Sequence, residues 1–517
     1  MDWLNVAVIV VYLGAMVGFG FWGRARTKKA DDYLLAGRRL GFGFYTSTMV
    51  VVVLGGASAV GGVGLGYKFG ISGFWMVAAI GVGVLVLSAF FASKMRRLRI
   101  YTVVQMLLMR YGTESTQAAS IIMLAYTLML AATSTGAYAS IFIVVFGWDR
   151  WLAILVGGAV VLLYSTIGGM YSITLADVVQ FFIMTIGLFG LMIPFGLSKA
   201  GGWSAMHDRL DAEFFNIGGI GLQSIITYFV IYTLGILIGQ DIWQRVFTSR
   251  TPEIAQRGGI VAGIYCILFG IGGAIAGMAA KAVMPTIENK DAVFGFIATD
   301  LLPAGLGGIA LAAGIAAMMS TASGALIAAS TVATKDVRPF LKKLLAGKRP
   351  KTLGVSEVLS SMEEQRDQTS QVKQNQLLVL VLGAASMVLA MAVPDVVAAL
   401  TISYAILVGG LLVAIIGGFV WSRGNGAGAA WSMMVGTIVT LSTMIYLELN
   451  AETPLDGIYA NEPIYFGLLA SFVTFVLVSL LTPSTPQDIK KLWKESIQQN
   501  KAAEETEVAQ LVASTKG

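Results

Sequence analysis

The fold is decided by one apolar stretch, Val50-Val-Val-Val-Leu-Gly-Gly-Ala-Ser-Ala-Val-Gly-Gly-Val-Gly-Leu-Gly-Tyr-Lys-Phe-Gly70. It is long enough to cross a bilayer as a helix. The pair Gly55-Gly56 falls in mid-span, where two glycines cost roughly 1–2 kcal/mol of helix propensity and favour an unwound segment with free carbonyls. Such carbonyls are hard oxygen ligands, so the stretch predicts a broken membrane helix suited to Na⁺. Gly62, Gly66 and Gly70 recur every four residues, which is typical of a close packing face and does not match a GxGxxG phosphate loop.

The composition is that of an integral membrane protein. Of 517 residues, 56% are hydrophobic and only 12% are charged, which does not fit a water-soluble surface. The single cysteine, Cys266, excludes an intramolecular disulfide and a cysteine metal cluster. The single histidine, His207, leaves no two-histidine zinc site and lies in a polar loop at 200–219, so we do not expect an enzyme.

Thirteen apolar stretches are long enough to cross a bilayer. The first is followed by a basic run and has no cleavage site, so we expect a retained span rather than a signal peptide. The stretches are 3–23, 43–69, 73–93, 117–147, 151–170, 175–197, 222–244, 258–283, 305–332, 377–393, 396–421, 427–447 and 462–482.

Lysine and arginine are unevenly divided between the alternating loops. One side carries 29 of the 35, and the other carries six, namely Lys68, Arg150, Lys199, Arg209, Lys281 and Lys290. Because basic loops stay in the cytoplasm, we expect a multi-pass protein of the plasma membrane with its N-terminus outside and its C-terminus inside. The net charge of +6 is then a topology signal, and no nucleic-acid partner is expected.

One membrane domain is expected over residues 1–482. Two polar stretches lie outside the bilayer, a cytoplasmic loop at 335–375 and a charged tail at 483–517. No soluble catalytic or kinase domain fits in either of them, so we expect a solvated connector and a tail, with a regulatory role as the alternative.

The ninth span concentrates hydroxyl groups in an otherwise apolar helix. Ala317, Ser320, Thr321 and Gly324 follow the spacing i, i+3, i+4 and i+7, which places them on one face. Such hydroxyls either bond back to their own helix or, facing an unwound glycine segment, supply neutral oxygens to a monovalent cation. The spacing alone leaves both interpretations open. Asp177, at the start of the sixth span, is likewise either a helix N-terminal acid or part of an ion path.

A second interruption, Gly235-Ile-Leu-Ile-Gly239, lies in the seventh span. Counted from the second span, the two breaks fall in the first and sixth helices. This placement predicts two inverted five-helix repeats, at about 43–197 and 222–421, with the ligand held where the broken helices meet.

Three motifs resemble the sodium:solute symporter family. They are GGMYSITLADVVQ at 168–180, the segment from Leu302-Pro303 that leads into LAAGIAAMMSTASGALIAASTVATKD at 311–336, and Trp243-Gln-Arg245. They occur in the family's order, and the resemblance covers roughly residues 3–480, closest in motif to the choline and urea branch. It implies an all-α LeuT-like fold of 5+5 inverted repeats with one extra N-terminal and two extra C-terminal helices.

The resemblance also implies the site residues. Sodium would be held by the backbone oxygens of Val51, Leu54 and Ala317 and by the hydroxyls of Ser320 and Thr321. Some members hold a second sodium with an acid equivalent to Asp177 and further serines. Here Ser323 matches, but the next position is Gly324, which departs from that pattern.

The resemblance is less informative about the solute. The family's sugar carriers have a glutamine where this chain has Ser58, and their glutamate and lysine have no counterpart in 73–93 or 258–280, so a sugar is not expected. The proline carriers' aspartate and the choline carriers' tryptophan are replaced by Val53. The pocket would be lined by Val53, Ser58, Phe74, Trp75, Thr133, Thr135, Tyr232 and Gly235, mild ligands suited to a small organic solute.

The sequence therefore predicts a sodium-coupled symporter that imports a small organic solute by alternating access. Its partners would be the solute, Na⁺ and the lipid bilayer. A proton-coupled carrier of the same fold and a solute-sensing membrane module are the alternatives.

Overall fold

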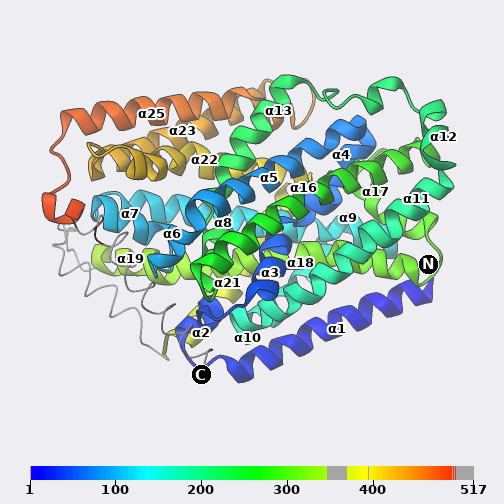
Figure 1. The fold of residues 1–517 in the computed structure, drawn as a ribbon, viewed down its shortest axis with the longest axis horizontal. Coiled ribbons are helices and arrows are strands. Elements are labelled where there is room, and N and C mark those ends of the chain that lie inside the picture. The colour runs from blue at the N-terminus through cyan, green and yellow to red at the C-terminus, as the bar shows by residue number, and fades with distance from the viewer. Residues whose placement is uncertain (1, 346–369, 394, 492, 494, 496–517) are drawn as a thin grey trace, which may run out of the picture.

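The structure is a computed structural model, and it describes all residues except 1, 346–369, 394, 492, 494 and 496–517. The described part is a bundle of long helices that lie roughly along one axis (Figure 1). Its first helices are α1 (Trp3–Arg26), α2 (Ala30–Leu35), α3 (Phe42–Val53), α4 (Gly62–Phe69), α5 (Trp75–Val86), α6 (Ala92–Arg97), α7 (Val103–Tyr111), α8 (Thr116–Gly136), α9 (Tyr138–Phe146), α10 (Arg150–Thr185) and α11 (Ile193–Lys199). They are followed by α12 (Gly202–Arg209), α13 (Leu222–Tyr228), α14 (Leu234–Ile236), α15 (Gln240–Thr248), α16 (Pro252–Val283), α17 (Val293–Phe296), α18 (Leu306–Val332), α19 (Arg338–Leu345), α21 (Ser370–Ala392), α22 (Val396–Val420), α23 (Gly426–Leu449), α24 (Asp456–Tyr459) and α25 (Glu462–Leu481).

The centre of the bundle is α18. The most apolar stretch of the span that contains it is 94% buried, and α18 packs against α1, α3, α8 and α10. Its sequence is mostly alanine, glycine, serine and threonine, and small side chains let neighbouring helices approach closely on every side. In this way the ninth span, with its run of hydroxyl groups, becomes the core of the protein.

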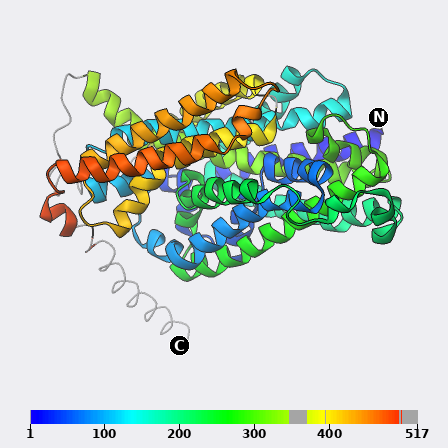
Figure 2. The same ribbon diagram turned by 90° about the horizontal axis from the view of Figure 1, so that it is seen from above.

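The outer helices flank this core. α1 packs on α10, while α23 and α25 pack together along the opposite edge in Figure 1, and Figure 2 shows the helices of this second pair side by side. These are the first span and the last two, so the arrangement agrees with a LeuT-like core that carries one extra helix at the N-terminus and two at the C-terminus.

Both predicted helix breaks are present. The second span is interrupted between α3 and a short turn of helix over Ala57–Gly61 that leads into α4. The seventh span is interrupted between α14 and α15, where the two parts are bent by 46° and Gly239 takes an extended conformation.

Ten helices of the described residues are long and apolar enough to cross a membrane, or up to eleven when the bent seventh span is included. Two of them are too long for one crossing. The helix over Arg150–Lys199 has 50 residues, which would reach about 75 Å against a hydrocarbon core of about 30 Å. Gly169, with φ 58° and ψ −147°, interrupts it, and Gly70, with φ 64°, interrupts the 41-residue helix over Ala57–Arg97. The count of thirteen crossings stays a prediction, and these two glycines are where additional crossings would be separated.

The basic segments gather at one end of the bundle. α2, α7 and α19 lie toward the end opposite the N-terminus and α12 (Figure 1). The expected loop at 335–375 begins as helix in α19, and the rest of that loop up to 369, like the tail beyond 495, lies outside the described residues. The orientation in the membrane stays a prediction.

Single cysteines test the orientation. Cys266 is fully buried and so gives a low labelling background. A cysteine at the exposed Arg209 is expected to react with an impermeant maleimide in intact cells, because it lies on the predicted outer side. A cysteine at the exposed Lys28 is expected to react only after permeabilisation. The opposite labelling pattern would reverse the topology.

Candidate functional site

The first helix break lies against α18. Leu54 leaves helical geometry, with φ −90° and ψ 54°, directly before Gly55. A Cβ on Gly55 would lie 2.4 Å from Oγ1 of Thr321, so only glycine lets the broken segment approach α18 this closely. On the other side of the break, Ser58 donates a hydrogen bond to the carbonyl of Val53 at 3.0 Å.

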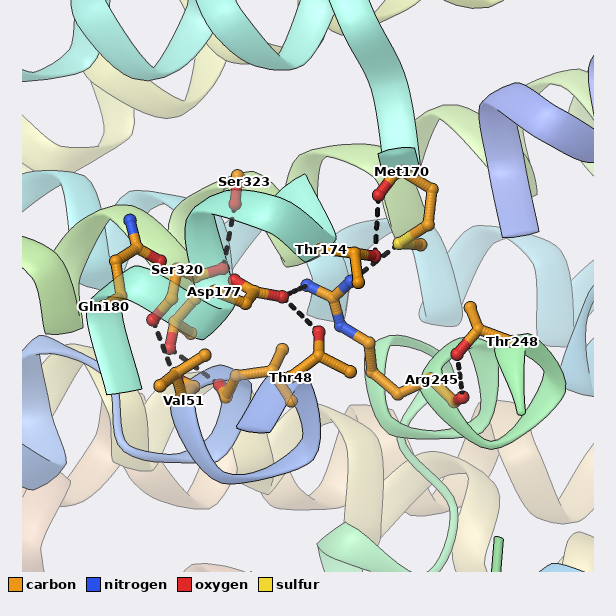
Figure 3. Close-up of polar contacts among 12 residues, drawn as sticks. Thr48, Val51, Met170, Thr174, Asp177, Gln180, Arg245, Thr248, Ser320 and Ser323 are labelled. Atoms are coloured by element: carbon orange, nitrogen blue, oxygen red, sulfur yellow. Dashed lines mark hydrogen bonds and ion pairs between the residues drawn. The ribbon is translucent and has the colours of Figure 1, made fainter. Parts of the chain in front are cut away.

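The hydroxyl groups of α18 meet the carbonyls at the end of α3. Oγ of Ser320 lies 2.6 Å from the carbonyl oxygen of Val51 and 2.9 Å from that of Ala317 (Figure 3). Thr321 donates to the carbonyl of Val52 at 2.7 Å. Three of the five predicted sodium ligands therefore converge on one point. The carbonyl that Thr321 contacts belongs to Val52, the residue after Val51, which is not among the predicted ligands.

These groups fit a monovalent cation. They are neutral, hard oxygens from backbone carbonyls and hydroxyls, which match Na⁺ and do not match a soft or strongly charged metal ion. Among the described residues, no group of three or more histidine, cysteine, aspartate or glutamate side chains converges. A site of this kind takes up one positive charge without burying a carboxylate beside it.

Asp177 forms a buried ion pair. Its Oδ2 lies 3.3 Å from Nη2 of Arg245 in α15, and both side chains are fully buried. Oδ2 also accepts a hydrogen bond from the hydroxyl of Thr48 in α3 (Figure 3). The pair thus joins α3, α10 and α15. The charge count places Arg245 among the 29 basic residues of the cytoplasmic loops, directly after the span at 222–244. In the structure it lies instead within α15, inside the bundle, where the acid compensates its charge.

Gly324 makes room for the guanidinium group. A Cβ at this position would lie 3.1 Å from Nη2 of Arg245. Ser323, the serine proposed for a second sodium, donates to the carbonyl of Ser320 within its own helix at 3.0 Å. Gly324 thus stands beside Arg245 at the position where the second-sodium pattern has a further serine.

The predicted solute ligands come from several segments of the chain. Val53, Ser58 and Gly235 lie at the two breaks, and Gly235 packs on the ring of Tyr404. The hydroxyl of Tyr232 lies 3.0 Å from that of Thr401. The remaining predicted residues have other contacts.

Thr133 and Thr135 donate to carbonyls of their own helix at 2.9 and 2.7 Å. Phe74 and Trp75 lie at the turn between α4 and α5, where the indole of Trp75 donates to the carbonyl of Ile217 at 2.7 Å. The assignment of these residues as solute ligands stays a prediction.

The sequence matches the sodium:solute symporter family over residues 33–436. The chain belongs to this family. Among its relatives, the sodium/pantothenate symporter of Escherichia coli is 26% identical over 93% of this chain and 96% of that protein. The human high affinity choline transporter 1 is 26% identical over 64% of this chain, and the match spans 61% of that protein. The family and these relatives are transporters, so this chain is a transporter and not an enzyme.

Solved structures support the fold. A Na⁺-coupled sialic acid symporter in a substrate-bound, outward-open state superposes with a TM-score of 0.72 at 18% identity, covering 94% of this chain and 99% of that one. Mhp1, a nucleobase-cation-symport-1 family transporter, superposes with a TM-score of 0.52 at 14% identity, covering 89% of this chain and 98% of that one. The expected LeuT-like fold is confirmed.

Two interactions of this symporter were not expected from sequence. One is the pairing of Asp177 with Arg245. The other is Asp241, which follows the second break, is buried, and accepts a hydrogen bond from the hydroxyl of Tyr126 at 2.8 Å. The available signal was the cost of a charge in an apolar span, which requires a partner for every such acid. That signal indicates that a partner exists but does not identify it.

Removing one member of the ion pair is expected to destabilise the symporter strongly. Arg245→Gln leaves the charge of Asp177 buried and unpaired, which costs about 3–5 kcal/mol of unfolding free energy. The double variant Asp177→Asn with Arg245→Gln removes both charges and is expected to recover much of that loss. Thermal unfolding in detergent measures both, with Arg209→Gln at an exposed position as control. If the effects of Arg245→Gln and of Asp177→Asn, each measured alone, simply add up in the double variant, the two residues are not coupled.

Proposed function

We propose that this member of the family imports a small organic solute together with Na⁺ by alternating access. The observation that carries the proposal is the convergence of the Ser320 and Thr321 hydroxyls on the carbonyls at the end of α3, beside the first break. Sodium would be held by the carbonyls of Val51, Leu54 and Ala317 and by these two hydroxyls. Sodium is named both in the family's name and in that of the sodium/pantothenate symporter of Escherichia coli.

The coupling follows from the helices that supply the ligands. Of the five proposed sodium ligands, Val51 lies at the end of α3 and Leu54 directly after it, and the other three lie in α18. An ion that needs oxygens from both helices binds most tightly when they are in contact, so it stabilises the conformation in which they meet. If the solute binds the same conformation, Na⁺ and the solute strengthen each other's binding by the same factor.

We infer further that a single sodium ion is coupled. The acid available for a second ion, Asp177, already faces the guanidinium of Arg245. A second cation would have to share that carboxylate with the guanidinium and would meet its positive charge nearby. The glycine at position 324, which leaves space for Arg245, supports the same stoichiometry.

The solute is proposed to be a small organic molecule other than a sugar. The names of two relatives specify pantothenate and choline, so the relatives do not agree on the charge of the solute. We place the chain in the plasma membrane with its N-terminus outside.

Sodium is expected to raise the melting temperature of the purified protein, because an ion that binds only the folded state stabilises it. Equimolar potassium or choline chloride is not expected to do so, since the oxygen site selects by size and field strength. The sodium titration should follow a single-site curve. Equal stabilisation by all three salts would remove the sodium assignment and favour a proton-coupled carrier, and solute binding without flux in proteoliposomes would favour a sensor.

The Thr321 variants are the internal control of this titration. Thr321→Ala removes one of five proposed oxygens and is expected to weaken the sodium affinity by at least about tenfold, or about 1.4 kcal/mol. Thr321→Ser keeps the oxygen and is expected to behave like the parent. A role in packing alone would cost about 1 kcal/mol of stability in Thr321→Ala and leave the sodium affinity unchanged. Identical sodium titrations of the two variants would contradict the site.

A further inference from the structure

A cavity of about 630 Å³ opens at the end of the bundle that carries α12 and the N-terminus. Its lining comes mainly from the end of α4, the end of α16 and the segment before α17. Three lysines line it, Lys68, Lys281 and Lys290, and the acids in its lining are Glu288 and Asp395. None of these residues belongs to the candidate sodium site.

The position of the lysines is unexpected. Only six lysines and arginines of the whole sequence fall on this side by the alternation of loops, and three of the six line this one cavity. Basic residues here oppose the charge bias that sets the topology. Their concentration in one cavity therefore needs a cause other than topology.

One of the three lysines is already neutralised. Nζ of Lys290 lies 2.6 Å from Oδ2 of Asp395 and 3.1 Å from Oδ1 of Asp291. The remaining oxygens of these two acids face the start of α22, where Asp291 accepts from the amide of Val396 at 3.1 Å and Asp395 from that of Ala398 at 2.8 Å. The helix N-terminus thus offsets the second negative charge.

The other two lysines have no acidic partner among the residues that the structure describes. The ammonium group of Lys68 lies 4.9 Å from the centre of the Phe69 ring. That of Lys281 donates to the carbonyl of Pro285 at 2.8 Å and lies 4.7 Å from the centre of the Tyr67 ring. Glu288, the remaining acid of the lining, is exposed to solvent. Within the described part of the chain, two ammonium groups without an ion-pair partner therefore border one cavity, against a single unpaired carboxylate.

The bridge between Lys290 and Asp395 lies over the broken helix. A Cβ on Gly64 would lie 2.5 Å from the carbonyl oxygen of Lys290, and one on Gly61 would lie 2.7 Å from Cγ2 of Val397. The segment around Lys290 and the start of α22 thus pack directly on the outer half of the second span. Lys290 and Asp395 also line the cavity, so the cavity borders this contact between the start of α22 and the second span.

We propose that this cavity captures a small organic carboxylate, held by the ammonium groups of Lys68 and Lys281, as the first step of its import. The bound carboxylate then competes with Asp395 for Lys290 and weakens the bridge that closes the outer side. The inference rests on the proposed sodium symport and narrows its solute to organic anions. It assigns Lys68 and Lys281 to solute selection outside the central site.

The test uses the full-length protein in proteoliposomes with an inward sodium gradient. The probes are the carboxylates pantothenate, N-acetylneuraminate, pyruvate and succinate, with neutral pantothenol and cationic choline beside them. We expect uptake of at least one carboxylate and no uptake of pantothenol or choline. Lys68→Gln with Lys281→Gln is expected to raise the KM of that carboxylate about tenfold with little change in maximal rate, since two partly exposed charge contacts are lost.

Two further variants separate charge from structure. Lys68→Arg with Lys281→Arg keeps both charges and is expected to retain the parent KM. Lys199→Gln removes an exposed lysine that does not line the cavity, and is expected to change nothing. The glutamine double variant should also lose most of the dependence of KM on ionic strength, because screening acts only on the charges that remain.

Three outcomes overturn the inference. They are uptake of choline or pantothenol in place of carboxylates, no uptake of any carboxylate in the panel, and an unchanged KM in the glutamine double variant. Sodium-driven uptake of choline or pantothenol would leave the sodium symport intact and remove only the anion preference. Failure of sodium to stabilise the protein would instead remove the symport itself.

Discussion

A carbonyl group freed by a helix break inside a bilayer has no water to bond with, and this constraint organises the centre of the protein. The carbonyls of Val51, Val52 and Val53, at the end of α3, all accept hydrogen bonds from side-chain hydroxyls. Two of the three hydroxyls belong to α18, from a distant part of the sequence. The broken helix is therefore stable in this form only while α18 lies against it.

The same requirement explains why the core is built of small residues. A hydroxyl of α18 reaches a carbonyl of α3 only if the two helices approach closely, and Gly55 removes the side chain that would collide with Thr321. Alanine and glycine along the rest of α18 allow the same approach by α1, α8 and α10. A sodium ion would take the place of the hydrogen-bond donors, because it binds several of these oxygens at once. Sodium binding and the contact between α3 and α18 would then stabilise the same conformation.

Local signals made much of this predictable from sequence. Glycine lowers helix propensity, so the interruptions at Gly55-Gly56 and at Gly235 to Gly239 predicted both breaks, and the spacing in α18 placed Ser320 and Thr321 on one face. The carbonyl that each hydroxyl contacts was harder to predict, because it depends on the register between two helices. Thr321 bonds to Val52, which was not in the expected set. The pairing of Asp177 with Arg245 and the placement of Lys68 and Lys281 along one cavity were not predictable, since each depends on separate segments and leaves no periodic trace in the sequence.

The charge balance of the protein links the ion pair to the outer cavity. Asp177 and Arg245 together carry no net charge, and the proposed sodium ligands are neutral, so binding one Na⁺ adds a single positive charge to the central site. A neutral solute would cross with that charge, and the membrane potential would contribute about 2.3 kcal/mol per 100 mV. A monovalent carboxylate captured by Lys68 and Lys281 would cancel the charge, so the loaded carrier would cross the low-dielectric bilayer neutral. Its uptake is therefore expected not to change when a potassium diffusion potential is imposed with valinomycin. Uptake that follows the imposed potential would mean that the solute is neutral or that more than one sodium ion accompanies it.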